Sequence, residues 1–251
     1  MSLRIAVIGC GMIGREHIER IQNRIKDASV VAVCDVSEEG AKKGAEIAGA
    51  DTRVYTDYNA AINDPDVNAV VVTTPGAFHK DPVIAAIQAG KPVFSEKPLA
   101  NTAADCKAVV DAEMASGRHL VQVGFMRRYD RGYKQVKELI DSGKFGAPMV
   151  IKCTHRADGV APDYTTAMAV TDTAIHEIDV LPWLVGDQWD EVQCIMPRSS
   201  SKAHEGLKDP QIMIMKTKTG IVNVLEVNVN CGFGYDINCE VVCENLSLIH
   251  I

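Results

Sequence analysis

The chain has few aromatic residues and lacks the composition of any unusual protein class. Its 251 residues include two Trp, six Tyr and five Phe, so the core must consist mainly of Val, Ile, Ala and Met. Because 47% of the residues are hydrophobic and 24% are charged, the sequence excludes collagen, low-complexity fibres and disordered chains. Acidic residues outnumber basic ones by 33 to 26, and the formal charge of -7 argues against a nucleic-acid or anionic-membrane partner.

Transmembrane and secretory features are also missing. No apolar run approaches the roughly 18–20 residues that a membrane-spanning helix needs. Residues 1–4 lead directly into an apolar strand pattern, without the charged leader and cleavage site of a signal peptide. The eight cysteines form no C-x-x-C pair, and most lie in apolar runs, where a free thiol behaves as a small hydrophobic group. These features predict a reduced, cytoplasmic protein rather than a disulfide scaffold or a zinc site.

The first 125 residues alternate between strand and helix patterns. The runs are continuously apolar rather than alternating, which is typical of parallel strands buried on both faces. The expected strands are residues 3–8, 30–34, 54–55, 69–73, 93–95 and 120–125. Helices are expected after the first, second, fourth and fifth of these strands, with Ser37 and Thr102 as N-caps. The pattern predicts a doubly wound parallel sheet. The first helix is indicated by Ile13, His17, Ile21 and Ile25, which lie near i, i+4 spacing.

The rhythm changes after residue 125. Strand-like segments become closely spaced, and several alternate between apolar and polar residues, which suits an antiparallel sheet with two different faces. We therefore expect two domains, 1–126 and 127–251, the second an α/β domain built on a large, mostly antiparallel sheet. Its expected strands are 149–153, 192–196, 211–216, 221–229 and 237–242, with helices at 129–141 and 172–185.

A G-x-G-x-x-G motif follows the first strand and opens a helix. Gly9 allows a tight turn, Gly11 lets the backbone approach a pyrophosphate, and Gly14 lets the helix pack on the strand. The phosphates would then lie at a helix N-terminus. Asp35 ends the second strand, where such proteins place an acidic residue against the adenosine ribose. The motif in this context predicts a Rossmann dinucleotide site, and the alternative is a glycine-rich turn without a ligand.

Asp35 also indicates which dinucleotide binds. A 2′-phosphate beside its carboxylate would cost ~4 kcal/mol at about 4 Å with an effective dielectric near 20. No Arg occurs in residues 35–39 to offset that repulsion. NAD is therefore expected rather than NADP, unless Asp35 is only a turn residue.

Lys97 follows the fifth strand in the segment Ser95-Glu96-Lys97-Pro98. Ligands of open α/β sheets lie beyond the carboxyl ends of the strands, so Lys97 is placed to reach the reactive end of a dinucleotide. On this tripeptide alone, a solvated surface lysine is an equally good interpretation.

A second candidate group lies in the helix expected at 172–185. Asp172, His176 and Asp179 fall on one face at i, i+4 and i+7, with Ile175, Ile178 and Leu181 more towards another side. A His flanked by carboxylates suggests acid–base chemistry, because a carboxylate can orient and stabilise an imidazolium. The alternative is a surface stripe of ion pairs. Metal binding is disfavoured because the second His of H-E-x-x-H is absent.

Five segments together carry a resemblance to a known family: residues 6–14, 73–75 with His79, 96–98, 124–130 and 172–187. They resemble the glucose–fructose oxidoreductase, inositol dehydrogenase and rhizopine-catabolism oxidoreductase family, and segments 126–128 and 172–179 point to its inositol dehydrogenase branch. The resemblance extends to about Glu244. It implies a Rossmann domain, a second α/β domain on a large sheet, and a homotetramer packed through those sheets.

The resemblance also implies site residues. It assigns catalysis to Lys97, Asp172 and His176. It implies NAD contacts from Gly9, Gly11, Met12, Ile13, Gly14, Asp35, Thr73, Thr74, Pro75, His79, Glu96 and Lys97. It implies polyol contacts from Lys97, Arg127, His155, Asp172, His176, Asp179 and Tyr235.

The implied activity is NAD-dependent oxidation of a ring hydroxyl of a cyclic polyol, in particular myo-inositol to 2-keto-myo-inositol (scyllo-inosose). His176 would be the general base, oriented by Asp172, and Lys97 would hold the reacting oxygen. The alternatives are a dehydrogenase of another sugar or inositol isomer, and a non-catalytic NAD-binding regulator of the same fold. Residues 245–251 do not resemble the family's continuation, so a second domain truncated at its C-terminus is expected, with a homotetramer only at full length.

Overall fold

The computed structural model describes residues 2–250, which divide into two compact units. One unit ends at Gly124 and the next begins at Phe125. Each unit has its own sheet and its own hydrophobic core. Within the described residues, no helix has both the length and the apolar character needed to cross a membrane.

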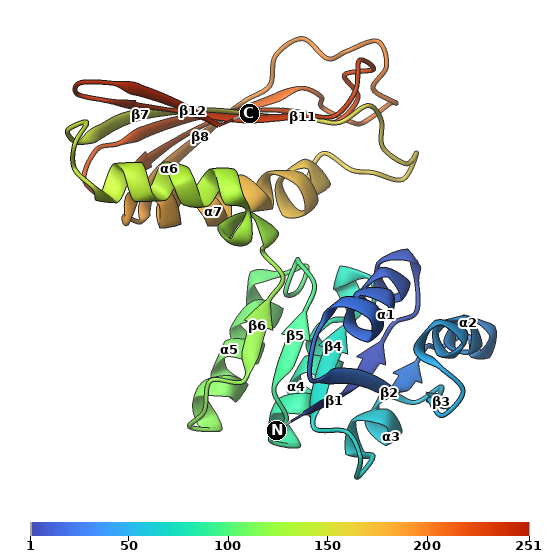
Figure 1. Cartoon of the computed structure of the whole chain (residues 1–251). Coiled ribbons are helices and arrows are strands. Elements are labelled where there is room, and N and C mark those ends of the chain that lie inside the picture. Colours follow the sequence, from blue (N-terminus) through green and yellow to red (C-terminus); the bar gives the residue numbers. More distant parts are fainter. Residues whose placement is uncertain (1, 251) are drawn as a thin grey trace. The chain divides into compact units, whose positions relative to one another are not determined.

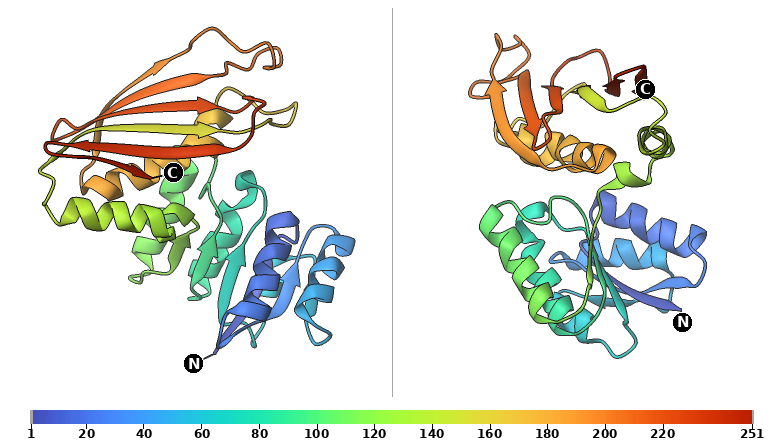
Figure 2. Two further views of the ribbon diagram at one scale, coloured as in Figure 1. Left: turned by 45° about the horizontal axis from the view of Figure 1, so that its top comes forward. Right: turned by 90° about the vertical axis from the view of Figure 1, so that its left-hand side faces the viewer.

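The first unit is a six-stranded, wholly parallel sheet with helices on both faces (Figures 1 and 2). The strand order is β3-β2-β1-β4-β5-β6, so the chain reverses its direction of travel between β1 and β4. This confirms the expected Rossmann topology. The strands are β1 (Leu3–Ile8), β2 (Ala28–Cys34), β3 (Arg53–Tyr55), β4 (Ala69–Val72), β5 (Val93–Ser95) and β6 (Val121–Val123). The helices are α1 (Met12–Arg24), α2 (Glu38–Ala48), α3 (Tyr58–Asn63), the 3-10 turn η1 (Gly76–Phe78), α4 (Lys80–Gln88) and α5 (Ala103–Ala115).

Side-chain caps begin several of these helices, as the sequence predicts. The Ser37 hydroxyl accepts a hydrogen bond from the Gly40 amide, and the Thr102 hydroxyl accepts one from the Asp105 amide. Each cap satisfies an amide that has no partner within its own helix. All four residues of the central strand β4 are buried, whereas the edge strands β3 and β6 are more exposed.

The helix expected after the glycine loop is present, but only some of the residues whose spacing indicated it lie in its core. Helix α1 buries Gly14, Ile18 and Ile21, whereas Ile13 is exposed and Ile25 lies beyond the end of the helix. Close packing of Gly14 against the Gly9 carbonyl fixes the rotation of the helix. That backbone contact, rather than apolar spacing, selects the face.

The second unit is a six-stranded mixed sheet in the order β12-β11-β7-β10-β9-β8. Strands β7 and β10 pair in parallel and the other four pairings are antiparallel, which confirms the mostly antiparallel expectation. The strands are β7 (Pro148–Arg156), β8 (Trp189–Ile195), β9 (Gln211–Thr217), β10 (Val222–Asn228), β11 (Asp236–Cys243) and β12 (Ser247–His250).

Two helices cover one face of this sheet (Figures 1 and 2). They are α6 (Arg131–Asp141), which follows the 3-10 turn η2 (Met126–Tyr129), and α7 (Ile175–Val185), which follows the π-helical turn η3 (Ala169–Ala174). Helix α6 is capped by Asp130, whose carboxylate accepts from the amides of Gly132 and Tyr133. The core between the helices and the sheet includes Ile151, Leu184 and Leu225.

The single helix expected at 172–185 is two elements, and the polar residues expected on one face differ in burial. Asp172 lies in the π-helical turn, and His176 and Glu177 are buried together with Leu181, while Ile178 is only partly buried. A π turn adds a residue to the helical repeat and so rotates the helix that comes after it. Polar residues take the buried side because they find hydrogen-bond and ion-pair partners there.

Candidate active site

A cleft of about 710 Å³ lies at the carboxyl ends of the central strands of the first unit. It opens where the strand order reverses, which is where open α/β sheets bind ligands. Eight of the residues expected to contact NAD line it: Gly9, Gly11, Met12, Ile13, Asp35, Thr73, Thr74 and Pro75.

The three glycines of the loop meet three different demands. Gly9 has a φ of 99°, and a Cβ there would lie 2.6 Å from the Thr74 backbone nitrogen. A Cβ on Gly14 would overlap the carbonyl oxygen of Gly9. A Cβ on Gly11 would meet no heavy atom within 4 Å, so the space beside Gly11 is open. This open space at the start of α1 fits a dinucleotide pyrophosphate.

The carboxylate of Asp35 is held by backbone amides. Its Oδ2 accepts from the Cys10 amide at 2.8 Å, and its Oδ1 accepts from the Ser37 amide at 2.9 Å. Burial, reinforced by the negative charge of Asp35, raises the pKa of the Cys10 thiol to about 12, so that thiol is neutral. The fixed acceptor at the edge of the cleft suits a ribose and repels a 2′-phosphate.

Two residues expected at the cofactor support the cleft without lining it. Gly14 packs beneath the loop. His79 is buried, and its ring nitrogens lie 2.5 Å from the Thr74 carbonyl oxygen and 2.6 Å from the Pro98 carbonyl oxygen. His79 therefore joins the loop after β4 to the loop after β5.

Glu96 and Lys97 are connected to α1 through His17. Glu96 Oε1 lies 2.7 Å from His17 Nε2, and Glu96 Oε2 accepts from the Lys97 amide at 3.2 Å. Burial by itself would raise the pKa of Glu96, but the hydrogen bond and charge of His17, with the Lys97 amide and charge, lower it overall. Lys97 is half-buried, which disfavours the solvated-lysine alternative.

Sequence reasoning missed several residues that line the cleft. Among them, Tyr58 begins the unpredicted helix α3, and Phe78 lies in the unpredicted turn η1. Phe78 is 66% exposed, so its ring is accessible to a flat ligand surface. Neither carries a motif, because apolar contacts to a nucleotide require only a surface of suitable shape.

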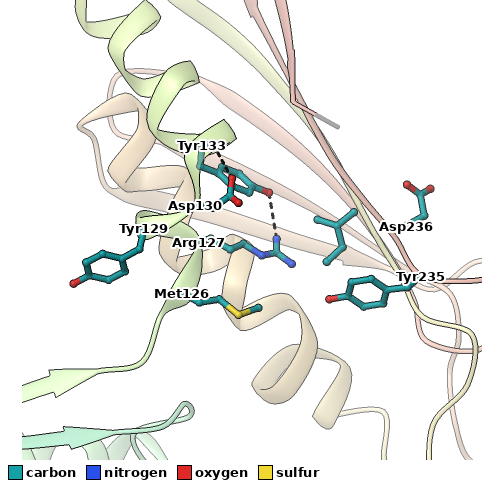
Figure 3. Close-up of a pocket in the computed structure, with 8 residues that line it drawn as sticks. Met126, Arg127, Tyr129, Asp130, Tyr133, Tyr235 and Asp236 are labelled. Atoms are coloured by element: carbon teal, nitrogen blue, oxygen red, sulfur yellow. Dashed lines mark hydrogen bonds between the residues drawn. The ribbon is translucent and has the colours of Figure 1, made fainter. Parts of the chain in front are cut away.

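The second unit contains a separate cavity of about 750 Å³. It is lined by Met126, Arg127, Tyr129, Asp130, Tyr133, Tyr235, Asp236 and Ile237. Figure 3 shows the Arg127 guanidinium between Tyr133 and Tyr235, whereas Tyr129 points away from it. Burial raises the pKa of Tyr133 to about 12, so its hydroxyl is neutral beside Arg127 Nη1 at 3.4 Å. A neutral hydroxyl and a fixed cation can both bind sugar-like oxygens.

Two histidines lie close to this cavity. The His155 ring meets the Tyr235 ring edge-on with centroids 5.9 Å apart, and the His176 ring lies 6.1 Å from His155. Arg127 Nη2 lies 3.2 Å from His155 Nδ1. The structure thus brings together four of the residues expected to contact a polyol.

Asp172 and Asp179, which were expected on one helix face with His176, have different surroundings. Asp179 pairs with Arg128, with Oδ2 2.8 Å from Nε and Oδ1 2.5 Å from Nη2. Asp172 is half-buried in the π-helical turn that precedes His176. Among residues 2–250, no cluster of three or more His, Cys, Asp or Glu side chains is arranged to hold a metal ion.

Comparison with family models gives a match for each of the two units. Residues 3–125 match the oxidoreductase family with an NAD-binding Rossmann fold, and residues 133–249 match the GFO/IDH/MocA C-terminal domain. The chain belongs to the GFO/IDH/MocA oxidoreductase family. Membership makes this an oxidoreductase whose first unit binds NAD, in agreement with the glycine loop and Asp35.

Two curated relatives in the family are inositol 2-dehydrogenases. The one from Klebsiella pneumoniae is 51% identical over 97% of this chain and 72% of its own length. The one from Pseudomonas fluorescens is 52% identical over 97% of this chain and 73% of its own length.

Solved structures of the family are similar throughout the chain. Myo-inositol dehydrogenase from Lactobacillus casei, in complex with NAD(H) and myo-inositol, matches with a TM-score of 0.96 and 40% identity, covering 99% of this chain and 74% of that one. A probable dehydrogenase from Thermotoga maritima matches with a TM-score of 0.91 and 31% identity, covering 98% of this chain and 75% of that one.

Proposed function

We propose that the protein is an NAD-dependent inositol 2-dehydrogenase, which oxidises a ring hydroxyl of myo-inositol to give 2-keto-myo-inositol. One observation carries the proposal: similarity over 99% of the chain to the Lactobacillus casei enzyme whose structure contains NAD(H) and myo-inositol. The cavity of the second unit supports it, because a guanidinium and two tyrosines suit a ligand rich in hydroxyl groups.

The residues of the first unit serve the cofactor. Its glycine loop, Asp35 and the Thr73-Thr74-Pro75 segment hold NAD, while His79 and Glu96 brace the loops that carry Thr74 and Lys97. Bound NAD accepts a hydride from the alcohol carbon, and that chemistry belongs to the cofactor.

The reaction also releases a proton, and three residues are assigned to it. His176 takes the hydroxyl proton as general base, and Asp172 orients the imidazole and stabilises its charged form. Lys97 donates a hydrogen bond to the reacting oxygen. Arg127, His155 and Tyr235 bind hydroxyls that do not react, and Asp179 contributes to the same group with its partner Arg128.

The test is cofactor reduction with a panel of polyols. Purified protein is mixed with NAD or NADP and with myo-inositol, scyllo-inositol or glucose, and the absorbance of the reduced nicotinamide is followed. Rapid reduction of NAD by myo-inositol supports the proposal. Faster turnover of another sugar or isomer would make that compound the assigned substrate. NAD binding without turnover of any polyol would favour a regulator.

We also propose that the first unit, up to about residue 126, is the cofactor domain of a cytoplasmic homotetramer and that the second provides substrate binding and assembly. The helix-free face of the second sheet supports assembly, and eight free cysteines support a reducing compartment (Figure 1). Light scattering of the purified protein measures the number of subunits.

A further inference from the structure

Glu177 is a fully buried carboxylate that has no part in the proposed hydride and proton transfers. It follows His176 in helix α7 and has an exposed fraction of 0%. An ionised carboxylate without partners would be very costly at such a position. Its neighbours must therefore compensate its charge, and they reveal what it does.

Each oxygen of Glu177 engages a residue from a different element. Oε1 forms an ion pair with Nη1 of Arg127, which lies in η2, and Oε2 lies 3.1 Å from Nδ1 of His155, which lies in β7. The three side chains are 1–6% exposed. Arg127 lines the cavity of the second unit, and His155 packs edge-on against Tyr235, which also lines it. Glu177 thus connects two groups at the cavity without lining it.

The contacts also determine the tautomer of His155. Its Nδ1 lies 3.1 Å from a carboxylate oxygen, which only accepts, and 3.2 Å from Arg127 Nη2, which only donates. A lone pair on Nδ1 would face the negative charge of Glu177, whereas an N–H there makes a charge-assisted hydrogen bond. The arrangement favours a proton on Nδ1 that is shared with the Glu177 carboxylate.

We propose that Glu177 is a positioning residue for polyol recognition. It neutralises and orients the Arg127 guanidinium, and it holds the His155 ring in place through Nδ1. A guanidinium and an imidazole held in fixed orientations can hydrogen-bond two hydroxyls of one ring. The inference rests on the proposed function and adds the residue that prepares the substrate site.

The first experiment needs no variant of Glu177. Histidine-labelled protein is studied by nitrogen–proton correlation NMR at mildly alkaline pH, with His155 assigned by the loss of its signals in His155→Gln. Signals of an Nδ1-protonated ring support the proposal. A His155 ring that lacks the proton on Nδ1 would overturn it, whatever reaction the protein catalyses.

The second experiment compares Glu177→Gln with the wild type. The amide keeps the shape and removes the charge, so we expect the KM for myo-inositol to rise at least about tenfold, with kcat changed less than about threefold. NAD affinity should be unchanged, because the NAD cleft lies in the first unit. Glu177→Asp, which restores the charge, should recover part of the KM.

A matched control is Glu191→Gln, which removes a carboxylate paired with Lys216 in the same unit but outside the cavity. Its KM should equal that of the wild type. A Glu177→Gln enzyme with wild-type KM, or one with lower thermal stability as its only defect, would reduce Glu177 to a structural residue. Absence of polyol oxidation in the wild type would refute the proposed function and leave the NMR experiment to decide the role of Glu177. If Glu177→Gln does not fold, the NMR result on the wild type decides as well.

Discussion

Asp35 combines two roles in one side chain, since it closes the glycine loop through the Cys10 amide and also lines the NAD cleft. Its second oxygen is taken by the Ser37 amide. Cofactor choice in this protein therefore depends on a charge whose position is fixed before NAD binds. Preorganisation of this kind lowers the cost of binding.

Asp35→Ser should weaken NAD binding and relax discrimination against NADP. The change removes a ribose acceptor and a negative charge. Relief of a third of the ~4 kcal/mol repulsion already changes the relative affinity for NADP about tenfold. We expect the ratio of kcat/KM for NADP over NAD to rise at least about tenfold. Asp35→Asn, which keeps one acceptor oxygen, should shift the ratio while losing less NAD affinity. An unchanged ratio in both variants would mean that Asp35 does not contact the ribose.

His176→Ala should lower kcat by roughly 10²–10⁴-fold, the usual contribution of a positioned acid–base group. NAD affinity should change little, because His176 belongs to the second unit. Steady-state inositol oxidation and a separate NAD titration measure the two effects. His119→Ala, at an exposed histidine, is the matched control and should behave as wild type. Near-normal turnover of His176→Ala would leave Lys97 as the leading candidate for the base.

Motif residues were predictable from sequence, but their supporting residues were not. The spacing of Gly9, Gly11 and Gly14 fixes a backbone shape, so the loop could be located from the sequence alone. Glu177 gave only a weak signal, because it is one of several polar residues in its helix segment. Its partners Arg127 and His155 lie far away in sequence, and only the tertiary fold brings them together.

Elements were easier to predict than the faces they bury. Strands such as β5 and caps such as Ser37 follow from local patterns. The buried face of α1 depends on one glycine contact, and that of α7 depends on a preceding π turn. A hydrophobic pattern averages over such single contacts, so it does not identify the buried face of either helix.

The start of α1 offers a matched pair of substitutions. Gly14→Ala places a Cβ against the Gly9 carbonyl, so it should cost about 1–3 kcal/mol of stability in the first unit, as overpacking does. Gly11 has a φ of -66° and open space beside it, so Gly11→Ala should cost at most about 1 kcal/mol. Gly11→Ala should nevertheless weaken NAD binding, because the methyl group occupies space expected for the pyrophosphate. Denaturant melts and NAD titrations separate the two effects, and unchanged NAD affinity in Gly11→Ala would place the pyrophosphate elsewhere.

At the scale of the whole molecule, the chain has two cores and an uneven distribution of chromophores. Both tryptophans, Trp183 and Trp189, lie in the second unit and pack partly buried against its core. The NAD cleft lies in the first unit. Tryptophan emission therefore reports on one unit, and cofactor binding acts on the other.

NAD should therefore stabilise the two units unequally. At a free concentration of about 100 times its Kd, it should stabilise the first unit by about 2.7 kcal/mol. Calorimetry should show an unfolding transition that moves to higher temperature when NAD is added. The midpoint of the unfolding curve followed by tryptophan emission should move much less. Myo-inositol alone is the reciprocal control. Equal shifts of both signals would show that the units unfold as one cooperative body.

The arrangement of strands also sets when each unit can form during synthesis on the ribosome. Strand β1 pairs with β2 and β4, so the first sheet can be completed as soon as residues 121–123 have emerged. Strand β7 pairs with β10 and β11, through contacts such as Val150 with Val222 and Cys153 with Cys239. One edge of β7 stays unpaired until about residue 228 has been made and the other until about residue 243, and unpaired strand edges invite association with other chains. Nascent chains of this protein should accordingly need a chaperone late in translation, after the nucleotide-binding half has already folded.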